Sequence, residues 1–108
     1  MDDAVVALTT VPGDFDAAGL AERLVTAGVA ACVSVLPAVE SIYVWDGALQ
    51  RDREQQLVIK TTRAASAALW DLLKSHHPYD LPEFIVLATI DGNPQYLEWV
   101  KSQVRRER

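Results

Sequence analysis

The sequence predicts an α+β domain whose elements follow the order β-α-β-β-α-β-α. Three observations support this prediction: continuous apolar runs that end at turn residues, apolar stripes at helical spacing between them, and a central Asp46-Gly47 pair typical of a tight hairpin. Two βα units around a hairpin indicate the split βαβ, ferredoxin-like arrangement. We therefore expect a βαββαβ sandwich with a long central hairpin and an extra C-terminal helix, formed as one domain by residues 1–108.

The first two elements are a strand and a helix. The apolar run Ala4–Val11 predicts a strand, which Pro12-Gly13 ends. Apolar residues then recur at helical spacing from about Phe15 to Ala27, with Asp14 or Asp16 as the capping residue. Gly28 stands where a helix C-terminus commonly needs a left-handed residue.

A long hairpin occupies the middle of the chain. Residues 29–45 read as a strand with a bulge or bend near Pro37, and a second strand returns from about Ala48 to Thr61. Apolar side chains gather near its tip: Ile42, Tyr43, Val44 and Trp45. A small monomer cannot easily cover them, and exposed apolar patches usually mark interfaces, so we expect an oligomer.

The last three elements are a helix, a strand and a helix. Apolar spacing predicts the first helix over about Arg63–His76, and the continuous apolar run Phe84–Ile90 predicts the strand. Asn93 can cap the final helix, which runs from about Pro94 to Val104, because proline suits the first helical position.

Composition excludes several classes of function. The formal net charge is −5, and the only dense basic run is Arg105, Arg106 and Arg108, so we expect no nucleic-acid partner. One cysteine cannot form an intrachain disulfide. The first residues lack the basic segment of a signal peptide, and no apolar run approaches the roughly 20 residues needed to span a bilayer. We expect a cytoplasmic protein without a membrane partner.

Four segments together resemble the CutA divalent-cation tolerance family. They are LAERLVTAGVAACVSVLPAVESIYVWDG (Leu20–Gly47), KTT (Lys60–Thr62), KSHHPYDLPE (Lys74–Glu83) and GNPQYLEWV (Gly92–Val100). The resemblance implies a ferredoxin-like subunit and a compact homotrimer, in which hairpin strands of neighbouring subunits pair edge to edge. It also implies tolerance to divalent cations, most often copper, and a shape similar to PII-type signalling proteins.

His76 and His77 are the candidate metal ligands, since imidazole binds Cu2+ and Zn2+ well. The resemblance implies a copper site at such a pair, with a cysteine of the first strand as third ligand. Thr9 stands at that position here. Neighbouring helical residues project about 100° apart, so one ion reaches both only if the helix ends there. Alternatively, one histidine caps the last carbonyls and the other packs against Tyr79.

Further candidates lie outside the histidine pair. Cys32 is either a small buried thiol, a soft-metal ligand or a redox-responsive group. A polar and aromatic set is predicted to surround clefts between subunits, as the resemblance implies: Tyr43, Trp45, Glu54, Lys60, Tyr96 and Trp99. Lys60 follows three apolar residues in its strand, so we expect the stem of its side chain to be partly buried. Its ammonium then needs an anionic partner, either Glu54 or a bound anion. The alternative for the set is a structural ion pair plus interface aromatics.

No catalytic residue is predicted. The sequence contains no G-x-S-x-G, no H-E-x-x-H and no glycine-rich phosphate loop. Three functions remain open: a trimer for metal binding or metal tolerance, a PII-like sensor or scaffold that binds a small anionic ligand between subunits, and a structural trimer that anchors another protein.

Overall fold

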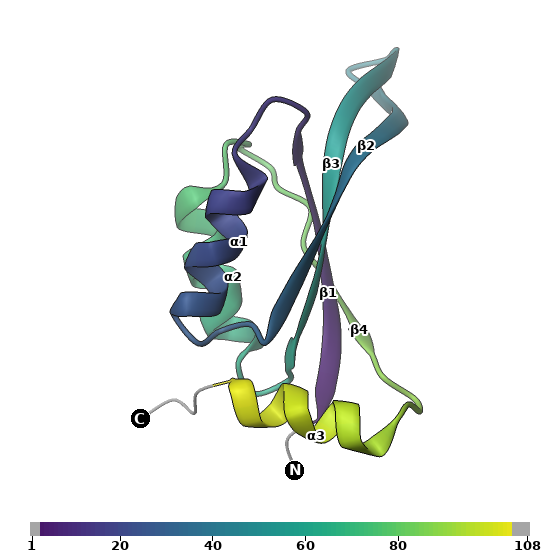
Figure 1. The fold of residues 1–108 in the computed structure, drawn as a ribbon. Coiled ribbons are helices and arrows are strands. Elements are labelled where there is room, and N and C mark those ends of the chain that lie inside the picture. Colours follow the sequence, from purple (N-terminus) through teal and green to yellow (C-terminus); the bar gives the residue numbers. More distant parts are fainter. Residues whose placement is uncertain (1–2, 105–108) are drawn as a thin grey trace.

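The structure is a computed structural model that describes residues 3–104, so the basic run at Arg105, Arg106 and Arg108 lies outside the described residues. The elements follow the predicted order (Figure 1). They are β1 (Ala4–Pro12), α1 (Ala17–Thr26), β2 (Cys32–Trp45), β3 (Ala48–Thr62), α2 (Ser66–His76), β4 (Ile85–Ala88) and α3 (Pro94–Gln103). Within residues 3–104, no helix is long and apolar enough to cross a membrane.

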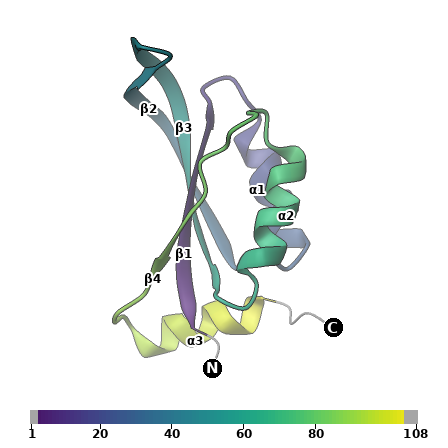
Figure 2. The same cartoon turned by 180° about the vertical axis from the view of Figure 1, so that it is seen from behind.

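The strands form one antiparallel sheet in the order β2-β3-β1-β4. Helices α1 and α2 lie side by side on one face of this sheet, whereas α3 runs across its end (Figures 1 and 2). Among residues 3–104, no helix covers the opposite face. This is the predicted ferredoxin-like sandwich with its extra C-terminal helix.

The core forms where the helical stripes meet the inner face of the sheet. Leu24 of α1 and Leu69 and Leu73 of α2 pack with Leu57 and Ile59 of β3, and all five are fully buried. A second cluster lies under α3, and it consists of Ala4, Ala31, Ala65, Val100 and Val104. Burial of each large side chain stabilises the fold by about 1.5–3 kcal/mol, so these contacts hold the helices on the sheet.

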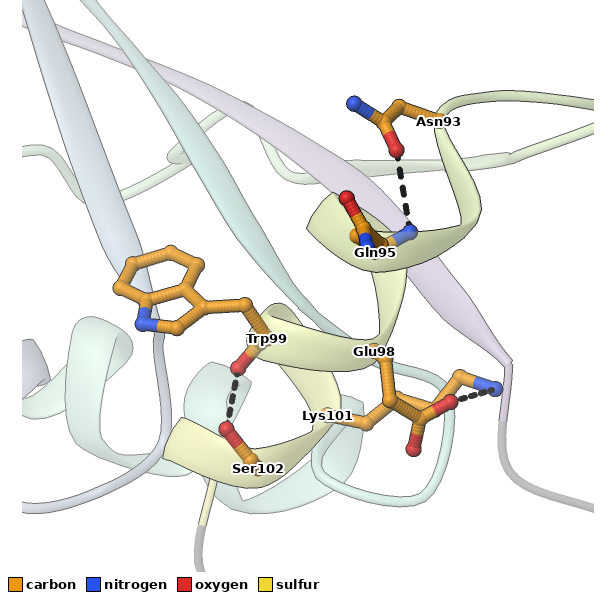
Figure 3. Close-up of polar contacts among 6 residues, drawn as sticks. All are labelled: Asn93, Gln95, Glu98, Trp99, Lys101 and Ser102. Carbon is orange, nitrogen blue, oxygen red and sulfur yellow. Dashed lines mark hydrogen bonds and ion pairs between the residues drawn. The ribbon is translucent and has the colours of Figure 1, made fainter.

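Local signals set the ends of the helices. Of the two predicted caps for α1, Asp16 is used, and its side chain accepts a hydrogen bond from the Gly19 N–H at 3.0 Å. Gly28 follows the helix at φ 80°, as predicted. Asn93 caps α3 by accepting from the Gln95 N–H at 3.0 Å (Figure 3).

The hairpin has the predicted turn and bulge. Asp46 and Gly47 adopt φ 58° and 78°, as a type I′ turn requires. The β2–β3 register shifts between Leu36 and Val39, on either side of Pro37. Beyond this shift the hairpin projects past the rest of the molecule (Figure 1).

Several elements are shorter than predicted: α1 spans Ala17–Thr26 rather than about Phe15 to Ala27, β2 begins at Cys32 rather than at residue 29, α3 ends at Gln103 rather than Val104, and α2 and β4 also lose residues. Helix α2 begins at Ser66 rather than Arg63, because the N–H of Ser66 first closes a turn onto the Arg63 carbonyl at 3.2 Å. Strand β4 spans Ile85–Ala88 instead of Phe84–Ile90, because it pairs only with residues 5–8 of β1. All four residues of β4 are exposed in the part of the chain that the structure describes.

Candidate functional site: the Glu54 pocket

A cavity of about 540 Å³ opens between the outer half of the hairpin and the loop that follows α2. Residues from β1, the two hairpin strands and that loop line it: Thr10, Ser41, Ile42, Tyr43, Trp45, Asp52, Glu54, Tyr79, Asp80, Leu81 and Glu83. We call it the Glu54 pocket. Cavities that bind small molecules commonly have volumes in the range of about 300–1,000 Å³.

Glu54 is the buried carboxylate of the pocket, with only 7% of its surface exposed. It alternates along β3 with Leu57 and Ile59, which face the helices, so it points to the opposite face of the sheet. Its Oε1 accepts a hydrogen bond from the Ser41 hydroxyl at 2.5 Å, and its Oε2 accepts one from the Tyr79 hydroxyl at 2.6 Å. Two neutral donors thus hold the carboxylate in place.

The acidic groups of the pocket act on each other. Burial raises the pKa of Tyr79 above its usual range, and the hydrogen bond to Glu54 raises it further. The hydrogen bond that the Tyr43 hydroxyl donates to Asp52 raises the pKa of Tyr43. Burial, followed by the nearby charge of Glu54, raises the pKa of Glu83. Each of these three raised pKa values means that the protonated, uncharged form of the group is favoured over its anion.

His77 holds one wall of the pocket. Its Nδ1 accepts a hydrogen bond from the Tyr79 N–H at 3.1 Å, so the ring proton is on Nε2. Nε2 donates to the Thr10 carbonyl at 2.9 Å and lies 3.2 Å from Oγ1 of the buried Thr9. Burial lowers the pKa of His77, while the Thr10 carbonyl and Glu54 oppose that shift. The neutral ring uses both nitrogens within the fold.

His76 faces different partners. Its ring is exposed, and its Nδ1 lies 3.1 Å from the Leu72 carbonyl and 2.9 Å from the Ser75 hydroxyl. The His77 ring packs 5.2 Å from the Tyr79 ring. The His76 ring thus contacts the Leu72 carbonyl within α2 and the His77 ring lies against Tyr79, while metal binding by the pair stays a prediction. Across residues 3–104, no three His, Cys, Asp or Glu side chains come together as a group that fits a metal ion.

Cys32 and Lys60 lie far along the sheet from the pocket. They face each other across β2 and β3, and Cys32 is half-buried, so it is not the fully buried thiol that was one of the alternatives predicted for it. Lys60 donates to the Ser34 hydroxyl at 3.1 Å. Six residues of strand, about 20 Å, separate Lys60 from Glu54. The ion pair predicted between them is therefore not among the contacts of the described residues.

The predicted aromatic set divides into two parts. Tyr43 and Trp45 line the Glu54 pocket, whereas Tyr96 and Trp99 pack against each other on α3 with ring centroids 5.7 Å apart. Figure 3 shows the Trp99 ring on the side of α3 away from Glu98. Of the six residues of the polar and aromatic set, Tyr43, Trp45 and Glu54 line the pocket, whereas Lys60, Tyr96 and Trp99 are not in its lining.

Sequence reasoning missed six polar members of the pocket: Thr10, Ser41, Asp52, Tyr79, Asp80 and Glu83. Ser41, Tyr43 and Trp45 alternate along β2, and Asp52 and Glu54 alternate along β3, so each set lies on one face of its strand. The register places Ser41 opposite Asp52. That alternation was the available signal for the hairpin part of the site.

Comparison with known proteins shows to which family the chain belongs. The family model for the CutA1 divalent ion tolerance protein matches residues 5–103. The chain belongs to this family. Its relatives include the divalent-cation tolerance protein CutA of Salmonella newport, which is 42% identical over 103 residues, or 95% of this chain and 90% of that protein.

Solved structures of CutA proteins share the fold. The CutA1 structure from Oryza sativa has a TM-score of 0.93 at 39% identity, covering 97% of this chain and 96% of that one. A structure described as the PII-like protein CutA from Nostoc sp. PCC 7120, in apo form, has a TM-score of 0.87 at 30% identity, covering 95% and 99%. The predicted family and the ferredoxin-like fold are both confirmed.

Proposed function

We propose that this CutA-family chain is a non-enzymatic, cytoplasmic binding module for divalent-cation tolerance, which works as a homotrimer and binds its ligand in the Glu54 pocket. The observation that carries the proposal is the position of the pocket against the projecting hairpin. The same hairpin strands supply both a wall of the pocket and an uncovered apolar surface. Assembly and ligand binding would therefore act on the same segment.

The uncovered apolar surface supports a trimer. Val44 is 67% exposed and Leu49 is 68% exposed on the hairpin, and Ile90 after β4 is 98% exposed. Strand β2 is also an edge strand of 14 residues, and long unprotected edges favour pairing with another chain. Pairing with neighbouring copies would cover both features.

Mass in solution tests the assembly. Light scattering of the wild-type chain should give about three times the 11.9 kDa subunit mass at micromolar concentration. Leu49→Glu on the hairpin should lower that mass, and Val25→Glu, at an exposed apolar position of α1, is the matched control. A wild-type monomer would overturn the trimer.

Copper binding by His76 and His77 stays a prediction, and it requires the His77 ring to give up its contact with the Thr10 carbonyl or the Tyr79 N–H, whereas the contacts described for His76 use its Nδ1. Titration of the chain with Cu2+ and Zn2+ should be repeated with His76→Ala and His77→Ala. Equal affinity in the wild type and both variants would exclude the histidine pair.

The second candidate function is a PII-like signalling or scaffold trimer that binds an anionic ligand or a partner protein in clefts between subunits. Two observations favour it: the PII-like description of the Nostoc protein, and Lys60, whose ammonium is held only by the neutral Ser34 hydroxyl among the contacts of residues 3–104. A thermal-shift screen with nucleotides and dicarboxylates tests it. A ligand whose effect survives Lys60→Ala would exclude Lys60 as its binding group.

A further inference from the structure

The Glu54 pocket carries the charge that repels anions. Its described lining includes four carboxylates, Asp52, Glu54, Asp80 and Glu83, and no lysine, arginine or histidine. Lys60 lies outside this lining. An anionic ligand would have to enter against four acidic side chains, so a ligand of this pocket is expected to be neutral or cationic.

The carboxylates lack a counter-charge within the described part of the chain. Among residues 3–104, Glu54 accepts from the hydroxyls of Ser41 and Tyr79 alone, and Asp52 accepts from the Tyr43 hydroxyl. The ion pairs described within residues 3–104 join Glu40 to Arg51 and Glu98 to Lys101, both outside the pocket lining. A buried carboxylate without a cation is costly, and each carboxylate oxygen has a further lone pair for an N–H donor.

Aromatic rings complete the lining. Tyr43, Trp45 and Tyr79 line the same cavity as the carboxylates, and Leu81 adds an apolar wall. A cation within about 6 Å of an aromatic ring is attracted to its face, and ammonium ligands are commonly recognised in this way. Carboxylates and aromatic rings around one cavity therefore match a cation that carries a hydrocarbon part.

A bare metal ion fits the pocket less well. Calcium and zinc need several ligand atoms within about 2.0–2.6 Å, and no three carboxylate, imidazole or thiol side chains between residues 3 and 104 converge in this way. The volume of about 540 Å³ also suits an organic molecule better than a single ion.

We propose that the Glu54 pocket binds an organic ammonium cation, with the carboxylates of Glu54 and Asp52 accepting its N–H groups and the rings of Tyr43 and Trp45 facing its charge. This inference shares one premise with the proposed function, namely that the Glu54 pocket is where the ligand binds. Burial is the larger cause of the raised pKa of Glu83, and the negative charge of Glu54, which a bound cation would offset, is the smaller one.

Three probes with four-carbon chains test the charge of the ligand: 1,4-butanediammonium, 1,4-butanediol and succinate. Titration calorimetry of the full chain, at constant ionic strength near neutral pH, should show saturable binding of the diammonium and none of the other two. Glu54→Gln keeps the shape of the side chain and can still bond Ser41 and Tyr79. It should weaken diammonium binding by about tenfold or more, as expected for a lost charge-assisted bond.

Matched variants distinguish binding in the pocket from non-specific attraction of the diammonium to the negative charge of the protein. Glu22→Gln on the exposed surface of α1 removes the same charge and should leave the affinity unchanged. Trp45→Leu should weaken binding, whereas Trp99→Leu on α3 should not. Circular dichroism of each variant shows whether it is folded, and if Glu54→Gln does not fold, Asp52→Asn replaces it.

The outcomes separate this inference from the trimer. No diammonium binding, binding unchanged in the folded Glu54→Gln or Asp52→Asn variant, or tighter binding of succinate would each overturn the inference. The mass of the same samples is measured by light scattering. A trimer that does not bind the diammonium refutes only the ligand class, whereas a monomer that binds it refutes only the assembly.

Discussion

Replacing His77 with alanine is expected to destabilise the fold by about 2–3 kcal/mol near neutral pH. The ring makes two hydrogen bonds, to the Tyr79 N–H and the Thr10 carbonyl, and each contributes about 1 kcal/mol. Its packing against the Tyr79 ring adds about 0.5–1 kcal/mol. Alanine removes all three contributions and leaves the pocket wall without its support.

The loss of unfolding free energy caused by His77→Ala should become smaller as the solution becomes acidic. Burial lowers the pKa of His77 below its usual 6.5, so the unfolded chain takes up a proton more readily than the folded chain. The stabilisation by His77 is therefore complete above pH 6.5 and is lost as pH falls through 6.5 toward the lower folded pKa. Protonation also places a hydrogen on Nδ1 against the Tyr79 N–H, which removes that bond.

Urea unfolding of the wild type and His77→Ala, followed by circular dichroism from about pH 5.5 to 8, measures both effects. One protein concentration is used throughout, because oligomers unfold in a concentration-dependent way. His76→Ala is the control, and its exposed ring should matter by less than about 0.5 kcal/mol. A cost below about 1 kcal/mol for His77→Ala near neutral pH, or a difference that widens in acid, would refute the reasoning.

Three further substitutions test the scaffold and the pocket wall by the same unfolding measurement. Leu57→Ala empties a fully buried core position and should cost about 2–5 kcal/mol; a value near zero would contradict its place in the core. Asn93→Ala removes the cap of α3 and should cost about 1 kcal/mol, with Asn93→Ser as the variant that restores it (Figure 3). Tyr79→Phe removes only the bond to Glu54 and should cost about 0.5–1.5 kcal/mol while leaving the pH dependence of His77 in place; loss of that dependence would show that the hydroxyl supports His77.

The sequence was sufficient for features that depend on near neighbours. Asp46 and Gly47 set the turn, Asn93 and Asp16 set caps, and the helical stripes identified the inner faces of α1 and α2, because each signal acts within a few residues. The length of β4 was not predictable in this way. It depends on how many residues of β1 remain opposite it, which only the sheet register decides.

The pocket depended on contacts between distant residues. Glu54 meets Tyr79 across 25 positions of sequence, and His77 meets Thr10 across 67. Strand alternation could have grouped Asp52 with Glu54, but no periodicity connects β3 to the loop after α2. For the same reason the sequence suggested Lys60 as the partner of Glu54, when neutral hydroxyls on two other segments hold that carboxylate.

Tyr79 explains how the two halves of the candidate site are connected. Its N–H donates to His77 and its hydroxyl donates to Glu54, so one residue ties the histidine that anchors the loop to the carboxylate inside the pocket. His77 can hold the loop only while Nδ1 is unprotonated and free of metal, because Nδ1 is the acceptor in that bond. Protonation or metal binding at Nδ1 would therefore release the wall that positions the Tyr79 hydroxyl. On this reasoning His77 acts on the pocket through Tyr79, and a metal ion at Nδ1 would compete with the folded wall rather than complete it.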